Sequence, residues 1–391
     1  MKLFLIKIGK AWNVLKQDGV WRGMKRNIQG FRRLFGKVGA GDILFVTNGI
    51  GDSARYRTHY VAEELRGKGF QVSVTVQDNP FLLSYPEKFS IFIFHRVLFT
   101  EKVKRFIEAI KKEGKTIIFE ADDLVYDPSY LTKLDYFTKM NPLERKLYAN
   151  GLGGEILADP YVEVATTTTQ YLSNKLREKG KRVFIVPNRL SQEDVMWAET
   201  LLEKGVLKNE ASVRIGYLSG TASHNEDFAT ITNSLVKILQ EFPQVQLVLA
   251  GPLELGSALE PFASRIERLP FAGRKEHFAN VATLDVNLAP LVVGDPFCES
   301  KSELKFFEAG ILGVPTVAAA TGTFRWAITD GVDGFVATRT EEWQEKLGKF
   351  IKNSEFRKHM GMKARETVLA KYTTANAKNE EYYNYLREKI V

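Results

Sequence analysis

Past residue 40, the chain alternates short, apolar, β-branched runs with stretches of helical periodicity, and it does so twice. The first series begins with the run at 43–47 and the second with the run at 213–218. Alternation of this kind predicts parallel sheets that are covered by helices on both faces. We therefore expect an α/β protein built from two halves of similar size.

The same pattern sets the expected elements and their bounds. In the first half we expect strands at 43–47, 71–76, 90–94, 116–120, 161–167 and 183–186, and helices at 53–66 and 101–112. In the second half we expect strands at 213–218, 246–250, 286–289, 316–320 and 334–337, and helices at 227–241, 275–281 and 303–310. The predicted divisions are a leader at 1–40, an N-terminal domain at 41–190, a connection at 191–211, a C-terminal domain at 212–375 and a last helix at 376–391.

The leader holds most of the positive charge. Residues 1–40 contain ten Lys or Arg and one acid, whereas the net charge of the whole chain is +8, so the remainder is nearly neutral. This distribution argues against a nucleic-acid-binding protein. Apolar residues recur at helical spacing from Trp21 to Phe35, which predicts an amphipathic helix in an anionic membrane interface. A helix packed on the protein itself, or one docked on a partner protein, stays open.

Two further features limit the class of protein. The apolar stretch near the N-terminus is interrupted by Lys7 and lacks a cleavage site, so we predict no signal peptide. The single cysteine, Cys298, excludes an internal disulfide and fits a reducing compartment. We expect a cytoplasmic protein held peripherally on the inner face of the cell membrane, without a metal site.

Several segments together resemble a known family. Residues 304–334 read LKFFEAGILGVPTVAAATGTFRWAITDGVDG, preceded by DVNLAP at 285–290 and IGYLSGTASHNEDF at 215–228. In the first half, SARYR at 53–57, FEADDLVY at 119–126 and VPN at 186–188 fit the same family. The chain resembles retaining, family 4-like GT-B glycosyltransferases of the bacterial cell-surface polysaccharide type over about residues 41–375. The resemblance implies two Rossmann-like domains that face each other across a cleft.

The resemblance also implies a donor site in the second half. Glu308 would accept hydrogen bonds from the ribose hydroxyls of the nucleotide, although a plain helix-surface glutamate is the alternative. Positive charge near the pyrophosphate would come from Lys301 and Lys305, which lie a turn apart. The further donor candidates are Gly220, Thr221, His224, Ser300 and Ser302.

The sequence departs from the family at both carboxylate and basic positions. The family has Glu-x7-Glu, but here Ser300 stands eight residues before Glu308, and Glu299 is one residue out of register. Which of the two takes the place of the first glutamate stays open. The basic pair that usually follows the first strand of this domain is absent, and His224 is the nearest candidate for a phosphate contact. The residues expected to be catalytic are Asp122, Lys305 and Glu299.

On the acceptor side, many family members carry a histidine where this chain has Glu120 and Asp122. Asp122 could bind acceptor hydroxyls, accept a proton, pair with a nearby arginine or cap a helix. The expected acceptor-binding residues are Gly51, Arg55, Arg57, His95, Arg96, Glu120 and Asp122.

The resemblance implies a hexosyl- or deoxyhexosyltransferase that moves a sugar from a nucleotide diphosphate sugar to a glycan or lipid-linked acceptor in surface polysaccharide biosynthesis, with retention. No cofactor is expected beyond the donor co-substrate. Two alternatives stay open: a degenerate GT-B scaffold in a polysaccharide assembly complex, and a sugar-nucleotide epimerase.

Overall fold

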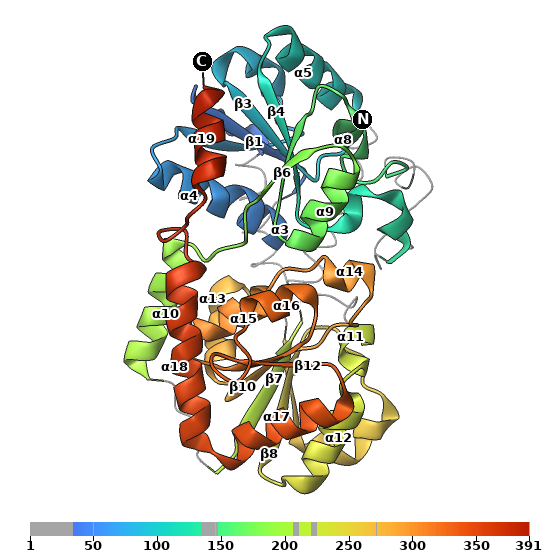
Figure 1. Cartoon of the computed structure of the whole chain (residues 1–391), viewed down its shortest axis with the longest axis vertical. Helices are drawn as coiled ribbons and strands as arrows, with labels where there is room; N and C mark the ends of the chain where they lie inside the picture. Colours follow the sequence, from blue (N-terminus) through green and yellow to red (C-terminus); the bar gives the residue numbers. More distant parts are fainter. Residues whose placement is uncertain are drawn as a thin grey trace. The chain divides into compact units, whose positions relative to one another are not determined.

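The computed structural model describes residues 34–49, 51–133, 145, 148–205, 211–219, 225–270 and 272–390 (Figure 1). The leader's residues 1–33, for which an amphipathic membrane helix is predicted, lie outside the described residues. Among the described helices, none is long and apolar enough to cross a membrane.

The chain divides into two compact units. The first takes Met1–Glu120, Leu152–Val164 and Glu381–Val391, and the second takes Ala121–Gly151 and Ala165–Glu380. Each unit thus gathers segments that are distant in the sequence. The domain bounds expected from the sequence stay predictions.

The N-terminal sheet has six strands in the order β2-β1-β3-β4-β5-β6. Its strands are β1 (Ile43–Thr47), β2 (Val72–Val76), β3 (Ile91–His95), β4 (Thr116–Ala121), β5 (Val164–Thr167) and β6 (Arg182–Ile185). Strands β1 and β3 are buried along their whole length, as expected for strands covered on both faces. The parallel register places Thr47 beside His95 and His95 beside Glu120, so three polar residues lie side by side at the carboxyl ends of neighbouring strands.

The helices of this half follow from local sequence signals. Thr100 caps α5 (Glu101–Lys112), which buries Val103, Phe106, Ile107 and Ile110. The helical run after β1 comprises α3 (Asp52–Ala54), the π-helical segment η1 (Arg55–Tyr60) and α4 (Val61–Gly67). The remaining elements are η2 (Leu82–Ser84), η3 (Pro86–Lys88), η4 (Leu124–Tyr126), η5 (Pro128–Lys133), α8 (Gly154–Ala158), α9 (Gln170–Glu178) and α19 (Glu380–Glu388).

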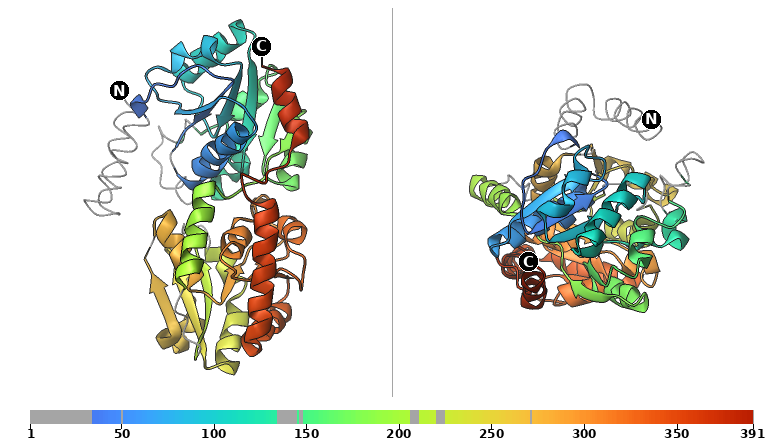
Figure 2. Two further views of the ribbon diagram at one scale, coloured as in Figure 1. Left: turned by 90° about the vertical axis from the view of Figure 1, so that its left-hand side faces the viewer. Right: turned by 90° about the horizontal axis from the view of Figure 1, so that it is seen from above.

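The C-terminal sheet is also parallel and six-stranded, in the order β12-β11-β10-β7-β8-β9. Its strands are β7 (Val213–Leu218), β8 (Val245–Ala250), β9 (Ile266–Leu269), β10 (Val286–Ala289), β11 (Thr316–Ala319) and β12 (Phe335–Ala337). The helices of this half are α10 (Gln192–Lys204), α11 (Asn225–Ala229), α12 (Thr232–Glu241), η7 (Ser257–Arg265), α13 (Arg274–Ala282), α14 (Pro296–Glu299), α15 (Leu304–Gly310), α16 (Gly322–Ala327), α17 (Thr340–Lys352) and α18 (Ser354–Lys371). The long α18 lies along α10, and Arg365 pairs with Glu199 there (Figure 2).

Both strand orders reverse direction once. The reversal lies between β7 and β10 in the C-terminal sheet and between β1 and β3 in the N-terminal sheet. Ligands of open α/β sheets bind outside the carboxyl ends of the strands at such reversal points. The fold therefore marks two places to search for function, one in each sheet.

Some expected elements differ from the structure. The strand expected at 161–167 begins only at Val164, because a turn holds the preceding residues: the Val162 N–H donates to the Asp159 carbonyl, and the Tyr161 N–H donates to the Asp159 side chain. The helix expected at 227–241 is two helices, α11 and α12.

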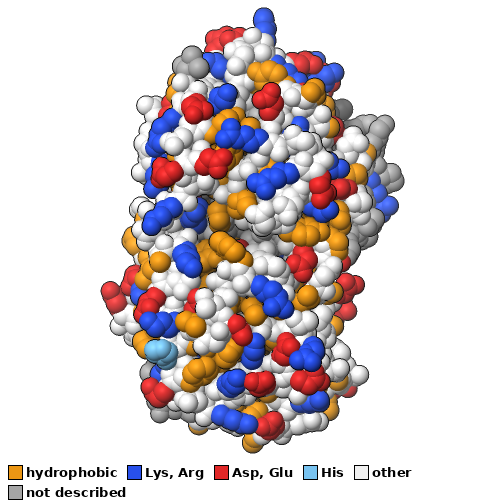
Figure 3. Space-filling model, viewed as in Figure 1, with side chains coloured by type: hydrophobic (Ala, Val, Ile, Leu, Met, Phe, Trp, Pro, Cys, Tyr) orange, Lys and Arg blue, Asp and Glu red, His pale blue; other side chains and the backbone are white. Residues whose placement is uncertain are grey.

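On the face that Figure 3 shows, acidic and basic side chains are interspersed, in keeping with the near-neutral charge outside the leader.

Candidate functional site

A lysine ammonium lies at the reversal point of the C-terminal sheet. Lys305, on α15, donates from its Nζ to the carbonyl of Leu218, the last residue of β7, at 2.7 Å. The same Nζ lies 4.9 Å from the centre of the Tyr217 ring. Burial lowers the pKa of Lys305 to about 8, with Glu308 opposing that shift and Lys301 adding to it. A partly desolvated cation at this point is suited to an anionic ligand.

Glu308 lies one turn further along α15 and belongs to an ion-pair cluster. One carboxylate oxygen pairs with Arg274, and the other lies 3.3 Å from Nε2 of His277. Arg274 also binds Asp194 through two hydrogen bonds of 3.1 and 3.0 Å. The Glu308 side chain is 14% exposed, so it is not a solvated residue of the helix surface. Its predicted contact with ribose stays a prediction.

The structure separates the two candidates for the first glutamate position. Ser300 is fully buried, and its hydroxyl donates to the Phe297 carbonyl at 2.7 Å, with Oδ1 of Asp123 3.4 Å away. Glu299 is partly exposed, and its carboxylate accepts from the N–H groups of Gly294 and Gly322, at 3.0 and 2.9 Å. Of the two, Glu299 has the acidic side chain that a ligand can reach.

The other predicted donor residues have mixed surroundings. Lys301 is partly exposed, with its Nζ 4.7 Å from the centre of the Phe297 ring. The hydroxyl of Ser302 accepts from the Asn188 amide at 2.9 Å. Gly220, Thr221 and His224 lie outside the described residues.

A histidine held at both ring nitrogens marks the reversal point of the N-terminal sheet. His95 ends β3, and its Nδ1 lies 2.9 Å from the Thr47 hydroxyl. Its Nε2 lies 3.0 Å from the hydroxyl of Ser53. His95 is 1% exposed, so its ring offers almost no surface to a ligand. Arg96, which follows, is non-glycine with φ of 49°, a strained conformation that is frequent at functional sites.

Two of the expected acceptor residues form a buried ion pair. Nε of Arg57 lies 2.8 Å from Oε1 of Glu120, and their side chains are 0% and 2% exposed. Arg55, by contrast, is partly exposed and pairs with Asp52. Burial makes Arg57 and Glu120 structural groups of the first unit in this conformation, while Arg55 lies where a ligand can reach it.

The remaining acceptor candidates, Asp122 and Gly51, lie in loops after strands. The helix-capping role that was the alternative for Asp122 is filled by its neighbour Asp123, which accepts from the Leu124 N–H at 2.7 Å and caps η4. Asp122 is partly exposed. Gly51 is exposed and precedes α3. The roles expected for Asp122 and Gly51 stay predictions.

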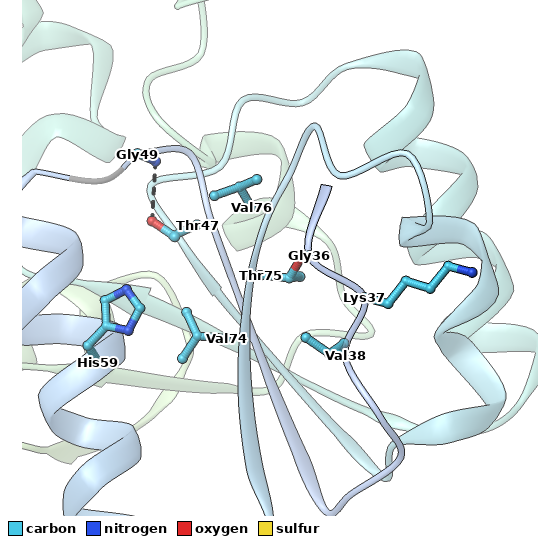
Figure 4. A pocket seen from close by; sticks show the side chains of 9 residues that line it. All are labelled: Gly36, Lys37, Val38, Thr47, Gly49, His59, Val74, Thr75 and Val76. Carbon is cyan, nitrogen blue, oxygen red and sulfur yellow. Dashed lines mark hydrogen bonds between the residues drawn. The ribbon is translucent and has the colours of Figure 1, made fainter. Parts of the chain in front are cut away.

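The first unit also contains a cavity that the sequence did not indicate (Figure 4). Its volume is about 110 Å³, and it lies beside β1 and β2. Its lining residues are Gly36, Lys37, Val38, Thr47, Gly49, His59, Val74, Thr75 and Val76. In Figure 4 the Lys37 side chain extends away from the other lining groups, and its Nζ lies 4.6 Å from the centre of the Phe81 ring.

Sequence reasoning missed Asp194, His277 and Ser53. A signal existed for one of them, since Arg274 and His277 are three residues apart on one helix and face the same way. No sequence signal marked Asp194 as part of a site, because an acid in the first turn of a helix is common for structural reasons alone. Across the described residues, no group of three or more His, Cys, Asp or Glu side chains is placed to hold a metal ion.

Residues 212–353 match the family model described as glycosyl transferases group 1. No curated protein matches the chain. Among solved structures, Anabaena HepE in complex with UDP and glucose is similar, with a TM-score of 0.59 and 13% identity over 89% of this chain and 100% of HepE. A glycosyltransferase from Rickettsia africae has a TM-score of 0.59 and 12% identity over 90% of this chain and 100% of its own. WaaG, a glycosyltransferase involved in lipopolysaccharide biosynthesis, has a TM-score of 0.54 and 14% identity over 88% of this chain and 99% of WaaG.

The two parallel six-stranded sheets with flanking helices are those of the GT-B glycosyltransferase fold. The stretch that matches this family model, residues 212–353, carries Glu299, Lys305 and Glu308. The predicted fold of two Rossmann-like halves and the predicted resemblance to GT-B glycosyltransferases are confirmed, whereas the helical leader stays a prediction.

Proposed function

We propose that this chain is a glycosyltransferase that moves a hexosyl or deoxyhexosyl group from a nucleotide diphosphate sugar to a glycan or lipid-linked acceptor, with retention. The observation that carries the proposal is the position of Lys305: a helix residue of the matched domain brings an ammonium to the carboxyl end of β7. The family's usual basic pair after this strand is missing, and Lys305 supplies positive charge at the same strand end.

The chemistry follows from the charge of the leaving group. As the bond between the sugar C1 and the β-phosphate oxygen breaks, negative charge builds on the nucleotide diphosphate. Lys305 and Lys301 stabilise that charge electrostatically, and partial burial strengthens the interaction. The acceptor oxygen bonds to C1 from the same face, and its proton passes to the departing β-phosphate. No separate base is required.

The two glutamates would position the donor. Glu308 accepts from the ribose hydroxyls, and Glu299 accepts from a hydroxyl of the transferred sugar. The Gly294 and Gly322 N–H groups hold Glu299 in place before the sugar arrives. The Glu299 carboxylate, held by two N–H groups, and the Lys305 ammonium at the end of β7 argue against the alternative that the chain is a degenerate scaffold. That alternative was based mainly on two departures from the family: the displaced first glutamate and the missing basic pair.

On the first unit, the acceptor would bind near Gly51, Ser53 and Arg55. Asp122, which belongs to the second unit, stays a separate candidate for a contact with acceptor hydroxyls. WaaG acts in lipopolysaccharide biosynthesis, and this supports a surface polysaccharide as the product. The basic leader would hold the protein at the inner face of an anionic membrane, where lipid-linked acceptors are concentrated. We propose no metal cofactor, because the two lysines take the place of a cation at the pyrophosphate.

The test begins with a thermal-shift screen of the full chain against UDP, GDP, dTDP, CDP and ADP. UDP is the first candidate because HepE binds it. A ligand at 100 times its dissociation constant adds about 2.7 kcal/mol to the free energy of unfolding. Donor hydrolysis without acceptor is then measured for the wild type, Glu308→Gln and Lys305→Ala, with excess EDTA in a parallel reaction.

The matched control is Lys358→Ala, since Lys358 is an exposed lysine of α18 that pairs only weakly with a neighbour on the same helix. We expect hydrolysis to fall at least about tenfold in both site variants and to stay unchanged in the control and in EDTA. If no nucleotide shifts the unfolding transition and no donor is hydrolysed, the glycosyltransferase proposal fails, and the chain is better described as a degenerate GT-B scaffold.

A further inference from the structure

We propose that Asp194 and Arg274 are positioning residues: they hold the Glu308 carboxylate toward the ribose hydroxyls, and thereby make the donor site selective for ribonucleotides over 2′-deoxyribonucleotides. The inference rests on the proposed function, because it assumes that Glu308 binds the ribose. It adds two residues from α10 and α13 to the site and restricts the class of nucleotide that the site accepts.

The geometry of Arg274 is the first argument. Its Nε and Nη2 bind the two carboxylate oxygens of Asp194 at 3.1 and 3.0 Å, and its Nη1 binds Oε1 of Glu308. A guanidinium that binds one carboxylate with two nitrogens is fixed in its plane as well as in its position. The nitrogen that reaches Glu308 therefore points in a set direction.

Asp194 is itself held in place. It is fully buried, its N–H donates to the Ser191 hydroxyl at 3.1 Å, and its side chain accepts from the Ser191 N–H at 3.4 Å. This capping box ties Asp194 to the start of α10. A continuous chain of contacts therefore links the start of α10 to Glu308: the capping box holds Asp194, Asp194 holds Arg274 through a bidentate ion pair, and Arg274 holds the Glu308 carboxylate.

The second oxygen of Glu308 is held as well, since Nε2 of His277 lies 3.3 Å from Oε2. Arg274 and His277 thus contact opposite oxygens of one carboxylate from neighbouring positions on α13. A carboxylate accepts about four hydrogen bonds, so ribose hydroxyls can be added without displacing these two contacts. The side chain is 14% exposed, which leaves it reachable.

The consequence is selectivity for the hydroxyls. A rigid carboxylate that is aimed at a hydroxyl discriminates strongly against an analogue that lacks it, because the charged acceptor then goes without its partner. One charged hydrogen bond corresponds to a preference of roughly ten- to hundredfold. A carboxylate free to rotate toward water would discriminate less.

The test measures dissociation constants of UDP and 2′-deoxy-UDP by calorimetry on the full chain, using the matching pair if the screen selects another base. The variants are Glu308→Gln, Arg274→Gln, Arg274→Lys and Asp194→Asn, each checked for an unchanged cooperative unfolding transition. The matched control is Arg357→Gln, because Arg357 is a similarly buried arginine of the same unit that faces Asp285.

We expect the wild type to prefer UDP roughly ten- to hundredfold. The preference for UDP should largely vanish in Glu308→Gln. It should fall several-fold in Arg274→Gln and Asp194→Asn. Arg274→Lys should show a preference intermediate between that of Arg274→Gln and that of the wild type. The preference should persist in the control. The double variant Arg274→Gln/Glu308→Gln should lose no more preference than Glu308→Gln alone, because both changes act on one contact.

Each contrary result has its own meaning. If Glu308→Gln loses the preference while folded Arg274→Lys and Asp194→Asn keep it in full, the two residues only join α10 to α13. The inference then fails while the proposed function stands. If UDP binds but every variant keeps the preference, Glu308 does not bind the ribose. If no nucleotide binds, the proposed function and the inference fail together.

Discussion

At the residue scale, the titration of Lys305 should make donor binding depend on pH. Its pKa is lowered to about 8 by burial, so the free site loses its ammonium as the pH rises through 8. A bound pyrophosphate favours the charged form, and hence the affinity for UDP should fall above about pH 8 and be nearly constant from pH 6.5 to 7.5.

Calorimetry from pH 6.5 to 9.5 measures this directly. Lys305→Arg retains its charge over the whole range and should give a flat profile. An identical fall in affinity for Lys305→Arg and the wild type would assign the titration to a different group.

The sequence revealed some of these residues and concealed others. Glu308 and Lys305 lie in a contiguous motif, so the local sequence was sufficient to select them. Whether Glu299 or Ser300 is buried depends on which side chain turns inward at the end of α14, which no local pattern encodes. Arg57 and Glu120 were expected to bind the acceptor because the motifs that contain them resemble those of the family, and only the structure reveals that they pair in the interior.

At the element scale, the strongly apolar elements were predictable. The bounds of β1, α5, β7 and β10 agree with the apolar runs, because burial on a sheet face or a helix stripe leaves a clear periodicity. Strand β9 was missed, because its sequence is Ile-Glu-Arg-Leu and it lies half-exposed at the sheet edge. The π-helical segment η1 carries no sequence signal that separates it from an α-helix.

A glycine in α18 sets how closely that helix approaches the turn after α15. A Cβ added at Gly361 would lie 2.0 Å from the carbonyl oxygen of Gly313, which is too close for any side chain. Gly361→Ala should lower the free energy of unfolding by about 1–3 kcal/mol, because backbone must move.

The matched control for this change is Gly348→Ala in α17. A Cβ there meets nothing within 4 Å, so the helix propensity of alanine should raise stability by up to about 1 kcal/mol. Urea unfolding of both variants gives the two values. Equal effects in the same direction would show that the close approach at Gly361 carries no energetic weight.

At the scale of the whole molecule, the last helix completes the first unit. Helix α19 buries Tyr382, Tyr383, Tyr385 and Leu386, and the Tyr383 hydroxyl donates to Glu64 of α4 at 2.7 Å. Figure 1 shows α19 beside α4. The sequence predicted this helix but could not place it, since nothing local indicates which half it joins.

Ending the chain at residue 379 should therefore destabilise the first unit selectively. Hydrogen exchange should rise in β1, β2 and α4, while β7 and β10 of the second unit keep their protection. A chain that ends at Glu388 retains the helix and should exchange like the full-length protein. Uniform exchange throughout both units after the truncation would mean that they unfold as one.

The position of α19 has a consequence for synthesis on the ribosome. The first unit requires Glu381–Val391, so it stays incomplete until the whole second unit has been translated. At about 5–20 residues per second, the nascent N-terminal strands wait roughly 10–50 s for their closing segment. The second unit, although translated later, is the first that can finish folding. During this interval the apolar surface that α19 later covers is available to the chaperones that meet emerging chains.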